Sequence, residues 1–245
     1  MTVLAWNSAF VALAVILGVA VLTWLVSLIR HDVSIVDPLW AVMITLSGWV
    51  YALAAPQIGP REGLVLLLAT IWAVRLSGHI AWRNRGHGED RRYQEIRARN
   101  QPHFGLKSLY LIFGLQAVLA WIVSLPLMAA LAGSTPWSLL DGIGAALWLF
   151  GISFEATADW QLSRFKADPA NAGQVMDRGL WRYSRHPNYF GEFCVWWGAW
   201  LVALSAGGFW SIVSPLLMTV LLLRVSGVAL LEKDIGERRP ADRST

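Results

Sequence analysis

The chain has 245 residues, of which 56% are hydrophobic and only 15% are charged. A soluble domain typically carries about 25% charged residues, so this composition excludes an ordinary soluble fold and predicts a membrane protein. The single cysteine, Cys194, excludes an internal disulfide, and the net charge of +4 reflects an uneven placement of basic residues more than an acidic partner.

Apolar runs predict seven membrane-spanning helices, because about 20 apolar residues cross the hydrocarbon core of a bilayer. In chain order they are residues 8–29, 38–55, 64–82, 107–132, 138–158, 189–206 and 209–231. Fifteen tryptophans fit this class of protein, since Trp gathers at membrane interfaces. The predicted fold is an all-α integral membrane protein with one transmembrane domain over residues 1–245 and no Rossmann domain.

The basic residues predict the orientation of these helices. If the N-terminus lies outside, Arg61 is the only basic residue in an outer segment, and the other Lys and Arg lie in inner segments or in the inner halves of helices. Cytoplasmic loops normally carry the excess of Lys and Arg. The sequence therefore predicts an N-terminus outside and a C-terminus in the cytoplasm.

Several charged residues fall within the predicted spans, where a charge is costly and usually faces the protein interior. All lie near the cytoplasmic ends: Asp37, Arg75, His79, Glu155, Asp159, Glu192, Arg224 and Glu232. One shared cavity open to the cytoplasm explains the set. For any single residue, a solvated helix end is an equally good explanation. Asp37 followed by Pro38 is also a typical helix start, in which Asp37 caps the helix and Pro38 takes its first position.

Two polar stretches contain candidate anion-binding groups. The loop at residues 83–93 is rich in Arg, which suits either phosphate oxygens or anionic lipid headgroups. The string at residues 179–192 places Arg and His beside a helix that Pro187 can begin, and helix amides there favour an anion. No Rossmann fingerprint, Walker motif, metal-ligand cluster or nucleophile elbow is present, so a bound nucleotide would require another kind of site.

Three strings carry a resemblance to a known family. Arg-His-Pro-Asn-Tyr-Phe-Gly-Glu at 185–192, Ser-Ile-Val-Asp-Pro-Leu-Trp at 34–40 and Gly-Glu-Asp-Arg-Arg-Tyr at 88–93 resemble bacterial membrane proteins grouped with the steroid 5-alpha-reductases. The resemblance covers most of the chain and is strongest from Asp159 to Glu232. It implies a bacterial inner-membrane enzyme that uses NADPH to reduce the double bond of an enone, such as a 4-ene-3-oxo steroid, at a site facing the cytoplasm.

The family pattern also implies roles for single residues. Asp37 resembles the acidic residue that hydrogen-bonds the 3-oxo group, and it could donate only in its protonated form; Trp40 and Trp72 complete the substrate site. Trp72 replaces a tyrosine of the vertebrate members, and its indole can donate a hydrogen bond but cannot act as an acid. The implied cofactor residues are Arg75, His79, Asn84, Arg85, Tyr93, Asp159, Lys166, Tyr183, Arg185, His186, Asn188, Tyr189, Glu192 and Arg224.

Two other functions remain open from the sequence. Membrane isoprenylcysteine carboxyl methyltransferases share an Arg-His-Pro-x-Tyr element and use S-adenosylmethionine, and a lipid-binding or transport protein needs no cofactor. The reductase is favoured, with residues 1–105 forming much of the substrate cavity and residues 106–245 supplying the main cofactor-binding elements. We expect a monomer that contacts membrane lipids and a lipophilic substrate, with no metal and no nucleic acid.

Overall fold

A computed structural model describes residues 3–55 and 57–225. The described part of the chain is 81% helix and contains no strand. It divides into two compact units. Of the described residues, unit 1 contains those up to Trp137 together with Ala203–Gly208, whereas unit 2 contains Ser138–Val202 and residues 209–225. The all-helical part of the predicted fold is therefore confirmed.

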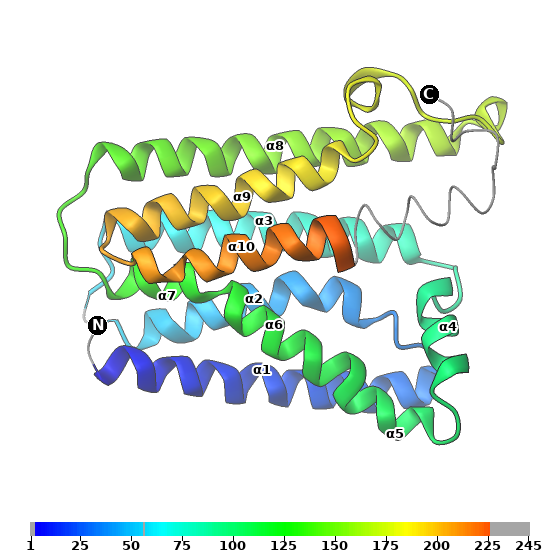
Figure 1. Cartoon of the computed structure of the whole chain (residues 1–245), viewed down its shortest axis with the longest axis horizontal. Coiled ribbons are helices and arrows are strands. Elements are labelled where there is room, and N and C mark those ends of the chain that lie inside the picture. Colours follow the sequence, from blue (N-terminus) through cyan, green and yellow to red (C-terminus); the bar gives the residue numbers. More distant parts are fainter. Residues whose placement is uncertain (1–2, 56, 226–245) are drawn as a thin grey trace. The chain divides into compact units, whose positions relative to one another are not determined.

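Unit 1 is a bundle in which α2 packs against α1, α3 and α6, and α3 packs against α7. Figure 1 shows these helices side by side. The elements are α1 (Val3–Arg30), α2 (Val36–Leu53), α3 (Pro60–Asn84), α4 (Arg91–Arg99), α5 (Phe104–Ser108), η1 (Leu109–Gly114), α6 (Leu115–Val123) and α7 (Leu125–Ala132). The run from α5 to α7 was predicted as one span, and Pro126 explains the break after α6 because proline cannot supply the amide that a continuous helix needs.

Unit 2 is built around two long helices, α8 and α9. Its elements are α8 (Leu139–Ala167), η2 (Pro169–Asn171), η3 (Gly179–Arg182), α9 (Pro187–Ser205), η4 (Phe209–Ile212), α10 (Val213–Val220) and η5 (Leu221–Val225). Ser138 begins α8 as a capping box with Asp141, and Pro187 begins α9 as predicted.

Glycines bring α8 and α9 into backbone contact. A Cβ added at Gly151 would lie 2.6 Å from the carbonyl oxygen of Gly191, and one at Gly198 would lie 2.7 Å from that of Gly144. Each helix thus carries two glycines seven residues apart, on one face. Small residues allow close helix packing of this kind, which is frequent in membrane proteins.

Among the described residues, five helical stretches are long and apolar enough to cross a membrane. They are Trp6–Arg30, Val36–Leu53, Pro60–Asn84, Phe104–Ala132 and Leu139–Ala167, and they coincide with the first five predicted spans. The sixth prediction corresponds to α9, a helix of 19 residues, and the seventh to a shorter apolar stretch, Phe209–Arg224, whose predicted continuation lies outside the described residues. The spanning role of these last two, and the orientation, stay predictions.

The structure corrects three details of the sequence interpretation. Asp37 does not cap α2: Ile35 occupies that position, and Asp37 lies in the first turn, with Pro38 after it. The loop predicted after α3 contains α4, which the apolar pattern does not reveal because it is strongly polar. Helix α8 continues to Ala167, so Arg164 and Lys166 belong to its last turn rather than to a loop.

Candidate functional site

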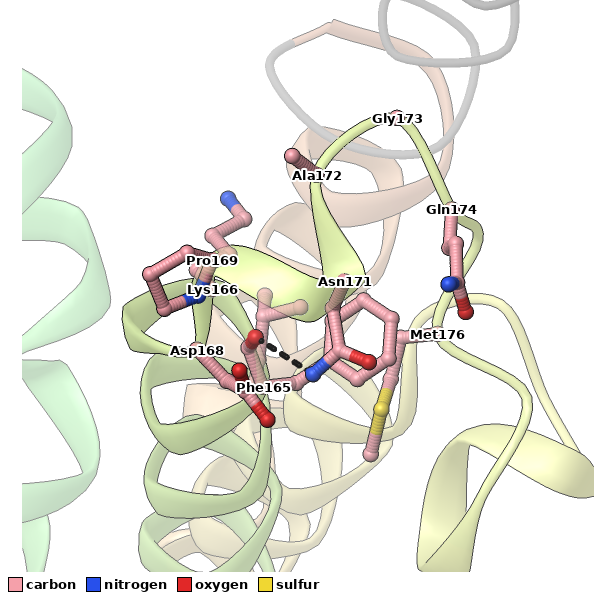
Figure 2. A pocket seen from close by; sticks show the side chains of 10 residues that line it. Phe165, Lys166, Asp168, Pro169, Asn171, Ala172, Gly173, Gln174 and Met176 are labelled. Carbon is pink, nitrogen blue, oxygen red and sulfur yellow. Dashed lines mark hydrogen bonds between the residues drawn. The ribbon is translucent and has the colours of Figure 1, made fainter.

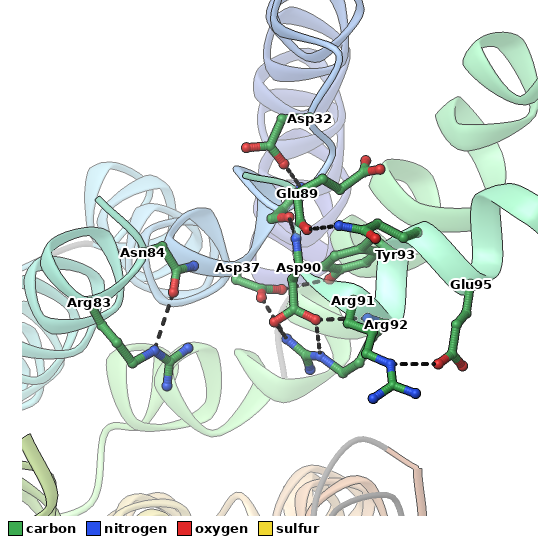
Figure 3. Close-up of polar contacts among 12 residues, drawn as sticks. Asp32, Asp37, Arg83, Asn84, Glu89, Asp90, Arg91, Arg92, Tyr93 and Glu95 are labelled. Carbon is green, nitrogen blue, oxygen red and sulfur yellow. Dashed lines mark hydrogen bonds and ion pairs between the residues drawn. The ribbon is translucent and has the colours of Figure 1, made fainter. Parts of the chain in front are cut away.

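In unit 1, the carboxylate of Asp37 is joined to two residues of α4. Tyr93 Oη donates to Asp37 Oδ1 at 2.6 Å, and Arg92 Nη2 donates to Asp37 Oδ2 at 2.9 Å (Figure 3). Both oxygens of Asp37 therefore act as acceptors, as they do in an ionised carboxylate. The only hydroxyl proton in this contact belongs to Tyr93.

Asp90 places these two side chains. It precedes α4 as its cap, with Oδ1 accepting from the backbone amide of Arg92 at 2.9 Å and from Arg92 Nε at 3.0 Å. The guanidinium of Arg92 consequently joins Asp90 to Asp37. We call Asp37, Asp90, Arg92 and Tyr93 the polar corner. Three of its members come from the loop and helix that follow α3, and one comes from the start of α2.

The environment keeps the proton on Tyr93. Burial first, and then the neighbouring charge of Asp37, raise the pKa of the Tyr93 phenol well above its ordinary value of 10.0. Burial alone would raise the pKa of Asp90, but its bonds from Arg92 outweigh burial and hold that pKa below 3.8. At neutral pH the polar corner thus contains one arginine cation, ionised Asp90 and a protonated phenol that can donate.

The other predicted residues of unit 1 lie along α2 and α3. Trp72 is fully buried, whereas Trp40 and Arg75 are half-buried. The His79 ring lies 6.2 Å from the Trp82 ring, and Asn84 accepts a hydrogen bond from Arg83 Nε at 3.2 Å. Arg85, just beyond α3, is exposed, as are Arg83 and His87. The end of α3 therefore offers three exposed basic side chains.

In unit 2, three carboxylates lie on the facing sides of α8 and α9: Glu155, Asp159 and Glu192 are all buried. Asn188 Nδ2 donates to Asp159 Oδ1 at 3.3 Å, and Trp196 Nε1 donates to Glu192 Oε1 at 3.0 Å. The glycine contacts set this arrangement, because a Cβ at Gly191 would meet the Cβ of Glu155 at 2.6 Å. Within the described residues, no group of three or more His, Cys, Asp and Glu could hold a metal ion.

The remaining predicted residues of unit 2 lie near the ends of these helices. The rings of His186 and Tyr189 stack with centroids 5.4 Å apart, while Tyr183, Arg185 and Arg224 are exposed. Glu232, the last of the predicted intramembrane charges, lies outside the described residues.

A cavity of about 300 Å³ opens where α8 ends (Figure 2). Lys166 lines it together with Phe165, Asp168 and Asn171, and the Asn171 amide donates to the Phe165 carbonyl at 3.0 Å. The lining combines one ammonium, one carboxylate and apolar surface.

Sequence reasoning did not single out Asp90, Arg92 or Trp196 as functional partners. The signal for Trp196 was present, because it follows Glu192 by four residues on one helical face. Asp90 also has the residue type and place of a helix cap. Nothing in the sequence pointed from Arg92 to Asp37, since 55 residues separate them.

Comparison with known proteins places the chain in a family. Residues 23–243 match the family described as "Protein of unknown function (DUF1295)". An uncharacterized protein of Schizosaccharomyces pombe is 29% identical over 211 residues, a match that covers 75% of this chain and 61% of that relative. The chain thus spans less than two thirds of the relative's length. No solved structure matches the chain. Because the matched region includes nearly the whole chain, the protein belongs to the DUF1295 family.

Proposed function

We propose that the protein is a membrane-embedded reductase that uses NADPH to reduce the double bond of a lipophilic enone, of which a 4-ene-3-oxo steroid is the leading example. The observation that carries the proposal is the Tyr93–Asp37 contact beside Arg92. Reduction of an enone places negative charge on the carbonyl oxygen, and a donor aimed at that oxygen stabilises it. The Tyr93 phenol, which its surroundings keep protonated and which lies against the first turn of the apolar helix α2, is such a donor.

In this proposal the Asp37 carboxylate and the Tyr93 phenol have different roles. Tyr93 has one hydroxyl proton, so it can donate to a substrate carbonyl only by releasing Asp37. Arg92 remains on Asp37 when this happens, which keeps the carboxylate compensated and makes the exchange less costly. In this proposal Asp37 orients Tyr93 and does not itself donate, in contrast to the role expected from the sequence.

NADPH would supply the hydride to the β-carbon of the enone, and solvent would supply the proton at the neighbouring carbon. The donor set fits a phosphate-rich ligand, since Arg83, Arg85 and His87 are exposed at the end of α3. Unit 2 separately contains further residues of the predicted cofactor set, of which Asn188 donates to Asp159 and Glu192 accepts from Trp196.

The test is a direct one. Purified protein in detergent is given NADPH and a series of steroid, polyprenyl and fatty enones, and NADPH fluorescence and the reduced product are followed. Consumption of NADPH that depends on the enone supports the proposal. Binding of S-adenosylmethionine without binding of NADPH would instead indicate a methyltransferase, and binding of neither would indicate a non-enzymatic lipid-binding protein.

We also propose that the chain lies in a bacterial inner membrane with its N-terminus outside, because Arg61 is the single basic residue of the predicted outer segments. Arg61 is buried and donates to the carbonyls of Thr135 and Pro136, so its charge is compensated within unit 1. Reporter fusions after residues 58 and 207 should give periplasmic signals, and fusions after 95 and 172 cytoplasmic signals. A periplasmic signal at residue 95 would overturn this orientation.

A further inference from the structure

A second set of contacts fixes the segment that carries Arg92 and Tyr93. Glu89 lies just before α4, and its two oxygens accept from Arg97 Nη2 at 2.7 Å and Arg97 Nε at 2.8 Å. Glu89 Oε1 also accepts from the backbone amide of Val33, between α1 and α2, at 3.0 Å. One carboxylate therefore ties both ends of α4 to the turn that leads into α2.

Neighbouring groups reinforce this attachment. Arg97 Nη2 reaches the carbonyl of His31 at 3.4 Å, and its guanidinium lies 4.5 Å from the centre of the buried Phe104 ring. The backbone amide of Asp90 donates to Ser34 Oγ at 2.7 Å. The Glu89 side chain is only 9% exposed, so its bidentate ion pair is shielded from water and is stronger than a surface pair.

Neither Glu89 nor Arg97 bonds to Asp37, yet their arrangement decides where Tyr93 can lie. Tyr93 is one turn along α4 from the attachment, and its hydroxyl must come within hydrogen-bond distance of a carboxylate on α2. A helix of nine residues is too short to be stable by itself in water. Its position must therefore come from its contacts, and the Glu89–Arg97 pair supplies the charged ones that bypass Asp37.

We propose that Glu89 and Arg97 are positioning residues, and that their ion pair holds α4 so that the Tyr93 hydroxyl reaches Asp37. The effect on turnover rests on the proposed function, but the effect on Tyr93 itself does not. Without the pair, α4 leaves the turn at Val33 and Tyr93 becomes accessible, although the rest of unit 1 keeps its packing.

The experiment measures nitration of tyrosines by tetranitromethane in the full-length protein, quantified by mass spectrometry. Tyr93 is 7% exposed, while Tyr51, at 2%, is a buried internal control and Tyr183, at 85%, is an exposed one. In Glu89→Gln, nitration of Tyr93 should rise about tenfold or more. The charged hydrogen bonds to Arg97 are lost, each of them stabilises the attachment of α4, and a detached α4 exposes Tyr93 to the reagent. Tyr51 and Tyr183 should react at the wild-type rate.

Two further variants make the result specific. Arg97→Lys keeps the positive charge but loses the two-pronged hydrogen bonding of the guanidinium to Glu89. It should therefore raise Tyr93 nitration by less than Glu89→Gln does. Glu95→Gln is the matched control: Glu95 is also on α4 and pairs with Arg91 and Arg99, but it is exposed, and its loss should leave Tyr93 unchanged. If the Glu89 variant also exposes Tyr51, nitration of Arg97→Lys decides the question. In Arg97→Lys, increased nitration of Tyr93 alone supports the positioning role, and increased nitration of both tyrosines overturns it.

Turnover gives the second readout. With an enone that the wild type reduces, Glu89→Gln should lower kcat about tenfold with KM for NADPH unchanged, since the phenol is misplaced rather than the cofactor. Wild-type nitration of Tyr93 in Glu89→Gln would overturn the positioning role even if the enzyme reduces enones. Enhanced nitration in a protein that reduces no enone would support the positioning role and refute the proposed function.

Discussion

In unit 1 the polar side chains around the start of α2 are held by opposite charges, whereas in unit 2 the buried carboxylates are held between two closely approaching helices. Arg92 compensates Asp37 and Asp90 in the first case. In the second, an amide and an indole donate to Asp159 and Glu192, and glycines bring the helix backbones together. The two units thus use different physical means to keep acidic side chains in an apolar protein.

The difference has a consequence for mutation. Charge compensation between side chains tolerates small movements, because long side chains can follow a shift of the backbone. Backbone contact between helices does not, because nothing at a glycine contact can be repacked. We therefore expect unit 1 to lose function before it loses stability, and unit 2 to lose stability with the smallest added volume.

The largest effect should come from Tyr93→Phe. The change keeps the buried ring and removes the only hydroxyl donor of the polar corner, so enone turnover should fall about a hundredfold while NADPH affinity persists. Steady-state kinetics and a binding titration measure the two quantities. Tyr110→Phe, at an exposed position of the same unit, is the control. Near-normal turnover in folded Tyr93→Phe would remove Tyr93 from the mechanism.

The next largest effect should be on the stability of unit 2. A methyl group at Gly191 would meet the backbone nitrogen of Glu155 at 2.7 Å and the carbonyl oxygen of Gly151 at 2.8 Å. Gly191→Ala should therefore cost about 1–3 kcal/mol, measured as a lower midpoint of thermal unfolding in detergent. Gly142→Ala, in the same unit, has open space at its Cβ and should be neutral or stabilising. Equal effects of the two changes would mean that backbone contact does not hold this unit.

Asp37→Asn tests whether the carboxylate only orients the phenol. Asparagine keeps the volume and one acceptor oxygen for Tyr93, but it loses the ion pair with Arg92. Turnover should fall about tenfold, which is less than for Tyr93→Phe and corresponds to about 1.4 kcal/mol. If Asp37 were itself the donor, Asp37→Asn would instead match or exceed the loss in Tyr93→Phe.

The sequence predicted the helices better than the contacts. Apolar runs of about 20 residues are dictated by membrane thickness, so the first five spans were found within a few residues, apart from the longer end of α8. Helix α4 was missed because its pattern is polar and its stability comes from partners such as Val33 and His31. Those partners are distant in sequence, and no local rule names them.

Single residues show the same limit. Asp37 was selected as a charge within a predicted span, and its functional role stays a prediction. Its capping role was wrong because α2 begins at Val36, so the cap is Ile35, two residues before Asp37. The four glycines at the contact between α8 and α9 lie in the sequence as two pairs with a spacing of seven, yet their meaning depends on which helices are neighbours. Trp72 was chosen from the family pattern. It is completely buried, and its role in substrate binding stays a prediction.

The smallest effect concerns the acid dependence of stability, and it separates the contribution of Glu89 from that of the polar corner. Burial alone would raise the pKa of Glu89, but the hydrogen bonds from Arg97 and from the Val33 amide outweigh burial and hold it below its ordinary value of 4.5. A carboxyl whose pKa is lower in the folded state stabilises that state above its ordinary pKa, and this contribution is lost as the pH falls through the lowered value. The wild type should therefore unfold at a higher temperature than Glu89→Gln at about pH 7, and the gap should narrow by roughly 2 °C on acidification to about pH 3.5. Asp90, whose pKa is also lowered, is present in both proteins and cancels from the comparison. Glu95→Gln should show no such narrowing, because Glu95 is exposed and its pairs are screened by water. A gap between wild type and Glu89→Gln that stays constant across this range would show that the charge of Glu89 does not stabilise the attachment of α4.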